Sequence, residues 1–179
     1  MLEKNIKEKH KKCPQQQYTH GCLWLAMACF KLGLGDKGFE LLSMMNPINH
    51  SKNIESINKY KKEPYVVAAD IYSSKGMEGR GGWTWYTGSS SWFYKIIIEE
   101  LLGFKIQDGY LKINPCIPKN WKNFEIHYKY KTSMYNFKIN NFKEKNTGVE
   151  KIIINNEVIQ DDKIFLQNNG KIYNVEIFM

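Results

Sequence analysis

The segment SWFYKIIIEELLGFKIQDGYLKI, residues Ser91–Ile113, contains the change of periodicity that decides the fold. Its first part, Ser91–Leu102, is rich in Trp, Phe, Tyr, Ile and Leu and is closed by Gly103, which predicts a mostly buried helix with a glycine C-cap. From Gly109 onward, apolar and polar residues alternate with the period of a β-strand. The chain is therefore expected to be an α+β protein, with helices before this segment and strands after it.

Upstream of this segment the pattern is helical. The expected helices are Gly21–Leu32, Asp36–Met45, Asn53–Tyr60 and Pro64–Tyr72. The first of these is apolar on nearly all faces, which is typical of helices in an interior shared with other helices. Where such neighbours are missing, apolar side chains are expected to be exposed, namely Leu23, Trp24, Met27 and Phe30.

Downstream, short alternating or β-branched runs are separated by Asn, Gly and Pro. The expected antiparallel strands are Tyr110–Ile113, Phe124–Lys131, Met134–Asn140, Lys151–Ile154, Lys163–Phe165 and Tyr173–Phe178. Asn155-Asn156 and Asn168-Asn169-Gly170 are typical of tight hairpin turns. We thus expect a polar N-terminus over residues 1–17, a helical region over 18–104 and a small antiparallel β-sandwich domain over 105–179.

Composition narrows the function classes. The 179 residues are 42% hydrophobic and 14% aromatic, which is ample for a packed core. The net charge is +8, but among 26 basic residues Arg80 is the sole arginine, and nucleic-acid recognition usually draws on arginine. A solvated, lysine-rich surface is therefore favoured over a nucleic-acid interface. Arg80 itself could clamp a phosphate or a sugar hydroxyl, or brace its loop through Glu78.

The cysteines, histidines and N-terminus predict a cytoplasmic protein without a metal site. The four cysteines form no Cys-x-x-Cys pair and are expected to be reduced, and the four histidines lack metal-ligand spacing. The N-terminal residues 1–12 are lysine-rich without the apolar core of a signal peptide. No apolar run approaches the ~20 residues that span a bilayer, so no membrane segment is expected.

The segment RGGWTWYTGSSSW, residues 80–92, joins a helix start to aromatic side chains. The first turn of the helix falls at Gly88, Ser89 and Ser90, where backbone N–H groups without intrahelical partners favour phosphate. Alternatively, a serine there is simply an N-cap and the glycines are turns. Trp83, Trp85 and Trp92 can stack on a sugar or fill a core.

Five ordered segments resemble the C-terminal end of the inverting β-glucoside phosphorylases, glycoside hydrolase family 94. These segments are Tyr18-Thr19-His20, NPINH at 46–50, YKKEPYVVAADIYS at 60–73, GRGGWTWYTGS at 79–89 and PCIPKNW at 115–121. The family includes cellobiose and chitobiose phosphorylases and the phosphorylase-like region of cyclic β-1,2-glucan synthase. The five segments are most similar to those of the synthase. The resemblance extends over residues 17–141.

The resemblance implies the last helices of an (α/α)6 barrel followed by a C-terminal β domain. It also implies that inorganic phosphate is the co-substrate, with no other cofactor, and attacks a β-linked glucan or glucoside while a carboxylic acid protonates the glycosidic oxygen. The family's phosphate-binding residues map onto His20, Thr87, Gly88 and Ser89.

The catalytic acid of the family lies in an upstream Trp-Asn-Asp segment that does not occur in this sequence. We therefore expect no catalytic residue here, a chain inactive alone, and the N-terminal part of the enzyme as a possible separate chain. Glu63 and Asp70 would share a face of the expected helix Pro64–Tyr72. Glu63 is interpreted as a sugar or positioning ligand and Asp70 as structural; the other candidate substrate-binding residues are Tyr65, Arg80, Trp83 and Trp85. A stand-alone carbohydrate-binding or structural module is the alternative.

Overall fold

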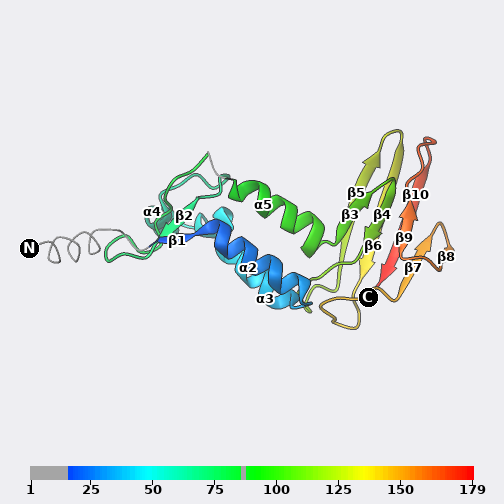
Figure 1. Ribbon diagram of the computed structural model, residues 1–179, viewed down its shortest axis with the longest axis horizontal. Helices are drawn as coiled ribbons and strands as arrows, with labels where there is room; N and C mark the ends of the chain where they lie inside the picture. The colour runs from blue at the N-terminus through cyan, green and yellow to red at the C-terminus, as the bar shows by residue number, and fades with distance from the viewer. Residues whose placement is uncertain (1–15, 86–87) are drawn as a thin grey trace, which may run out of the picture. The chain divides into compact units, whose positions relative to one another are not determined.

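The computed structural model describes residues 16–85 and 88–179 (Figure 1). The described residues divide into two compact units, the first formed by those up to Leu25 with those of Leu41–Phe93 and the second by Ala26–Glu40 with Tyr94–Met179. Helices and sheets are both present, which confirms the expected α+β class.

The helices lie close to their expected positions. They are α2 (Thr19–Lys31), α3 (Gly35–Met45), α4 (Ile54–Tyr60) and α5 (Ser89–Ile96), with a 3-10 turn η1 (Pro47–His50) and a π-helical turn η2 (Ile97–Leu101). The expected helix Ser91–Leu102 is thus α5 continued by η2. Gly103 follows with φ +65°, the left-handed conformation that a glycine C-cap adopts.

The expected helix Pro64–Tyr72 is wrong. Its last residues form the strand β2 (Asp70–Tyr72), which pairs antiparallel with β1 (Gln16–Tyr18). Ile71 also bridges to Gly81. Long-range pairing on two sides thus overrides the local pattern, and Glu63 and Asp70 do not share a helix face.

The second unit contains two sheets. The five-stranded sheet has the order β5 (Asn123–Tyr130), β6 (Ser133–Asn140), β10 (Ile172–Phe178), β7 (Lys151–Ile154) and β8 (Glu157–Ile159); the three-stranded sheet has the order β3 (Phe104–Gln107), β4 (Tyr110–Ile113) and β9 (Lys163–Phe165). All six expected strands are present. The expectation of wholly antiparallel sheets is wrong, because β10 enters between β6 and β7 and runs parallel to β6 (Figure 1).

One of the two expected hairpin turns is confirmed. Asn155 and Asn156 join β7 to β8 with φ of +48° and +74°, as a type I′ turn requires. The Asn168–Gly170 segment is not a hairpin, because β9 belongs to the three-stranded sheet and β10 to the five-stranded sheet. Instead, the backbone N–H of Thr132 donates a hydrogen bond to Oδ1 of Asn168 at 3.1 Å.

The two sheets share a hydrophobic core. The ring of Phe104 in β3 lies 5.1 Å from that of Tyr128 and 5.6 Å from that of Phe137, both in the five-stranded sheet. The fully buried side chains around them include Leu111, Ile113, Ile139, Val175 and Ile177. This pattern follows from the alternation of apolar residues along each strand.

The cysteines that the structure describes, Cys22, Cys29 and Cys116, are free thiols, as expected; Cys13 lies outside the described residues. Burial raises the pKa of Cys116 to about 11, so its thiol is protonated at neutral pH. No helix in the described ranges is long and apolar enough to cross a lipid bilayer.

Helix α2 exposes one apolar stripe. Leu23 and Phe30, expected to be exposed, are 0% and 4% exposed, and Met27 is half-buried. The exposed residues are instead Gly21, Trp24, Leu25 and Ala28, which recur at the three- and four-residue spacing of one helix face. Helix α2 is therefore apolar on its uncovered side as well as on its covered side.

Candidate functional site

The glycine-rich segment 80–83 is fixed beside β2 by backbone hydrogen bonds. Tyr72 N–H donates to Arg80 O at 2.9 Å, Gly82 N–H to Asp70 O at 2.9 Å, and Ala69 N–H to Trp83 O at 2.7 Å. The segment therefore runs as a third strand-like piece of the first unit. Its side chains are presented from a fixed backbone.

Two glycines of this segment lie closely against neighbouring side chains, which a Cβ atom would displace. A Cβ atom on Gly81 would lie 2.6 Å from Cγ of Lys62, and one on Gly82 would lie 2.0 Å from Oδ1 of Asp70. The Asp70 carboxylate also accepts a hydrogen bond from the backbone N–H of Trp83 at 3.3 Å. These contacts agree with a structural role for Asp70.

Two helix starts meet at His20 and Gly88. Thr19 anchors the start of α2, since its N–H donates to Ala69 O at 2.8 Å and its hydroxyl to Ala68 O at 2.7 Å. His20 follows in the first turn, and a Cβ atom on Gly88 would lie 3.1 Å from its Nε2 atom. Because α5 begins at Ser89, the positive ends of two helix dipoles lie together.

Two polar side-chain atoms of this cluster are buried and have no hydrogen-bond partner among the described residues. Among the described residues, the hydroxyl of Ser89 and Nδ1 of His20 are buried side-chain atoms that make no hydrogen bond. Ser89 is 0% exposed. A buried hydroxyl of this kind can be satisfied by a ligand or a bound water. The fourth residue of the predicted phosphate set, Thr87, lies outside the described residues.

Aromatic rings hold the histidine in place. The imidazole of His20 stacks on Tyr18 with centroids 5.1 Å apart and meets the edge of Trp24 at 6.0 Å. Trp24 in turn meets Trp92 at 6.1 Å. Trp92 is thus a packing residue in this row of rings, which restricts the orientation of the imidazole.

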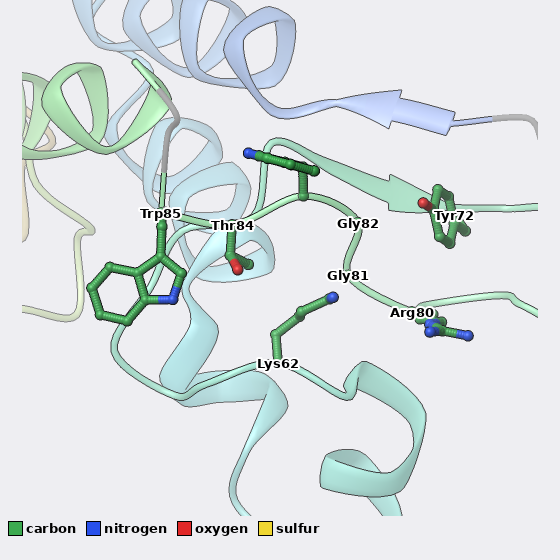
Figure 2. A pocket seen from close by; sticks show the side chains of 8 residues that line it. Lys62, Tyr72, Arg80, Gly81, Gly82, Thr84 and Trp85 are labelled. Carbon is green, nitrogen blue, oxygen red and sulfur yellow. The ribbon is translucent and has the colours of Figure 1, made fainter.

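A cavity of about 700 Å³ lies against segment 80–85 (Figure 2). It brings together the predicted residues Arg80, Trp83 and Trp85 and is completed by Lys62, Tyr72, Gly81, Gly82 and Thr84. Lys62, Tyr72 and Thr84 were missed by sequence reasoning. Lys62 could have been suggested by its position next to Glu63 in the motif at 60–73. Its approach to Gly81 and Gly82, however, depends on the tertiary fold and cannot be predicted from neighbouring residues.

Glu63, Tyr65 and Trp85 form a second group of predicted residues that the structure brings together. The indole N–H of Trp85 donates to Glu63 Oε1 at 3.3 Å, and the rings of Tyr65 and Trp85 lie 6.0 Å apart. The pKa of Glu63 is lowered by its own backbone N–H and by this indole N–H. Trp85 has φ +74°, an uncommon conformation for a bulky residue.

The two alternatives for Arg80 can now be compared. Glu78 accepts a hydrogen bond from Gly76 N–H at 2.8 Å, and within residues 16–85 and 88–179 Arg80 forms no ion pair with a carboxylate. The bracing interpretation is therefore not supported. Arg80 and Lys62 both line the cavity, and Figure 2 shows the guanidinium group of Arg80 turned away from the Lys62 side chain.

Comparison with known proteins identifies the family of this chain. The family model for the glycosyl hydrolase 94 superfamily, catalytic domain, matches residues 7–103. The cyclic beta-(1,2)-glucan synthase NdvB of Rhizobium meliloti (strain 1021) is 32% identical over 145 residues, which cover 81% of this chain and 5% of that protein.

Two phosphorylases are similarly related. The N,N'-diacetylchitobiose phosphorylase of Vibrio furnissii is 29% identical over 163 residues, 90% of this chain and 20% of the relative. That of Vibrio proteolyticus is 32% identical over 146 residues, 80% of this chain and 18% of the relative. The chain thus spans a fifth or less of the length of these relatives. The match to the family model covers more than half of the chain, which therefore belongs to the glycosyl hydrolase 94 superfamily.

Proposed function

We propose that this chain supplies the phosphate side, and part of the sugar side, of an inverting phosphorolytic site for β-linked glucans. In this proposal residues 18–104 are the last helices of an (α/α)6 barrel, and residues 105–179 are a C-terminal β-sandwich domain. The observation that carries the proposal is the position of His20 Nε2 against Gly88, beside the buried hydroxyl of Ser89.

This cluster has the donors that a phosphate needs. The start of α5 supplies backbone N–H groups, Ser89 supplies a hydroxyl, and His20 supplies a ring N–H. Hydrogen bonds to a charged oxygen are stronger than neutral ones, particularly where water is excluded. We propose that Thr87 completes the set, on the basis of the motif.

The bound phosphate would act as the nucleophile. One of its oxygens attacks the anomeric carbon, the glycosidic bond breaks, and the leaving oxygen takes a proton from a carboxylic acid on the opposite face of the sugar. The products are a sugar 1-phosphate with inverted configuration and the shortened glycan. Because no Trp-Asn-Asp segment occurs in the 179 residues, we propose that the acid comes from a polypeptide segment outside them.

The exposed stripe of α2 fits this arrangement. Trp24 and Leu25 are 51% and 55% exposed, and no atom lies within 4 Å of a Cβ atom built on Gly21. Small residues such as Gly21 and Ala28 allow another helix to approach closely, and an apolar helix face requires cover. We propose that helices of the rest of the catalytic domain, in the same or a separate polypeptide, cover this stripe.

Phosphorolysis in a reconstituted system tests the proposal. The chain is mixed with the upstream part of a family 94 catalytic domain that carries the Trp-Asn-Asp segment, and glucose 1-phosphate is measured with β-1,2- and β-1,4-linked glucosides and phosphate. We expect release in the mixture and none from either part alone. Release by the chain alone would contradict the assignment of the acid. No release from a mixture that forms a stable complex would contradict the proposed function.

Glu63→Gln is expected to weaken sugar binding more than phosphate binding in the reconstituted enzyme. The substitution removes the charge of a carboxylate held by Trp85, whereas the phosphate cluster keeps all its donors. We expect the KM for the glucoside to rise by about tenfold, as for the loss of one hydrogen bond to a charged group, with the KM for phosphate unchanged. Glu55→Gln is the matched control, and a selective rise in the phosphate KM would reverse the assignment.

A further inference from the structure

We propose that the cavity at segment 80–85 binds a saccharide that carries an anionic group, either a carboxylate or a phosphate ester. The inference deepens the sugar-binding role proposed above and rests on it for the saccharide part of the ligand. The anionic part is inferred from the charges that line the cavity.

Two cations and no carboxylate line this cavity. Lys62 and Arg80 are both among the eight lining residues, and none of the other six is charged. The stem of Lys62 packs on Gly81, and Figure 2 shows its ammonium group directed into the cavity. Within the described residues neither cation forms an ion pair with a carboxylate. The charged groups on the lining of the cavity are therefore both positive, which suits an anion.

The nearby carboxylates are held by other donors. Asp70 accepts from Trp83 N–H at 3.3 Å, Glu63 from the indole N–H of Trp85 at 3.3 Å, and Glu78 from Gly76 N–H at 2.8 Å. Each of these hydrogen bonds occupies one oxygen of a carboxylate near the cavity, and none of the three carboxylates lines the cavity itself. After the backbone N–H of Glu63 and the indole N–H of Trp85, Lys62 also contributes to the lowered pKa of Glu63. Like Arg80, however, Lys62 forms no ion pair within the described residues, so both cations can bind an incoming anion.

The rest of the lining suits a sugar ring. Trp83 and Trp85 are 66% and 63% exposed although they are large aromatic residues, and the apolar face of a sugar can stack on such rings. Tyr72 and Thr84 add hydroxyl groups that can bind sugar hydroxyls. Because backbone hydrogen bonds fix segment 80–83, this wall requires little ordering when a ligand binds.

The cavity is separate from the phosphate cluster. None of His20, Gly88 and Ser89 lines it. Its volume, about 700 Å³, falls in the usual range of small-molecule sites and far exceeds the size of a phosphate ion. Inorganic phosphate alone is therefore too small to contact Trp83 and Trp85 as well as the cations, whereas an anionic sugar can contact both.

Titration of the tryptophan fluorescence of the chain tests the inference, with glucuronate, glucose 6-phosphate and glucose as probes. We expect at least one anionic sugar to bind about fivefold more tightly than glucose, and added salt to weaken that binding. Glucuronate binding identifies the carboxylate and glucose 6-phosphate binding the phosphate ester. Equal affinity for glucose and both anionic sugars would overturn the inference.

Variants assign the binding to the cavity. Lys62→Gln and Arg80→Gln are each expected to reduce the affinity for the anionic sugar by about fivefold, whereas Lys62→Arg keeps it and Lys75→Gln, outside the cavity, does not change it. If both cavity variants behave like Lys75→Gln, the inference is wrong. His20→Ala separates this inference from the proposed phosphate site, since it should reduce phosphate affinity and leave the affinity for glucuronate, which carries no phosphate, unchanged.

Discussion

Gly103→Ala is expected to lower the free energy of unfolding by about 2 to 4 kcal/mol. Gly103 has φ +65°, which alone costs an alanine about 1 to 2 kcal/mol. A Cβ atom there would also lie 2.1 Å from the backbone carbonyl carbon and oxygen of Asn114. These are backbone atoms directly after the end of β4, so they cannot rotate away as a side chain would. Urea unfolding followed by circular dichroism measures the change.

Gly170→Ala is the matched control for this prediction. Gly170 has φ +74°, close to that of Gly103, but no atom lies within 4 Å of a Cβ atom built on it. The control therefore isolates the conformational cost, about 1 to 2 kcal/mol, from the steric one. Equal destabilisation by the two substitutions would show that the close approach to Asn114 does not contribute to the loss of unfolding free energy, which would contradict the prediction.

His20→Ala and Ser89→Ala are each expected to reduce phosphate affinity at least about tenfold, because each removes one donor to a charged oxygen. Ser89 is fully buried, and its hydroxyl has no partner among the described residues. His20 is held beside Gly88 by Tyr18 and Trp24. Isothermal titration with inorganic phosphate, on the chain or on the reconstituted enzyme, measures the loss.

His127→Ala provides the control for the histidine substitution. The His127 ring lies on β5, where Nδ1 contacts the Asn136 side chain at 2.9 Å, outside the cluster. Its removal should leave phosphate affinity unchanged. An equal loss in His127→Ala and His20→Ala would indicate non-specific attraction of phosphate to a positively charged protein.

Local patterns predicted most of the secondary structure. The alternation in Tyr110–Ile113 and the β-branched run in Lys151–Ile154 identified strands with the observed bounds. Asn155-Asn156 identified a turn because few residues other than glycine adopt positive φ at low cost. These signals depend on neighbouring residues alone.

Pairings between distant residues were not predictable in this way. The sequence of Asp70–Tyr72 predicts a helix, but in the structure this segment pairs with β1. The sequences of β10 and β6 do not indicate that these two strands pair in parallel. The site shows the same division. The helix start at Ser89 was visible from its own residues, but the approach of Lys62 to Gly81 depends on the fold. His20 was joined to Gly88 only by the family resemblance.

Phosphate binding by His20, Gly88 and Ser89 is tested most directly by an NMR titration of the chain with inorganic phosphate. The His20 ring nitrogens and the backbone amides of Gly88 and Ser89 report on the cluster itself, without the rest of the catalytic domain. We predict that these signals shift and saturate together with one dissociation constant, while the His127 ring signals stay in place. Unchanged signals from all three residues at phosphate concentrations that shift other parts of the chain would contradict a phosphate site at this cluster.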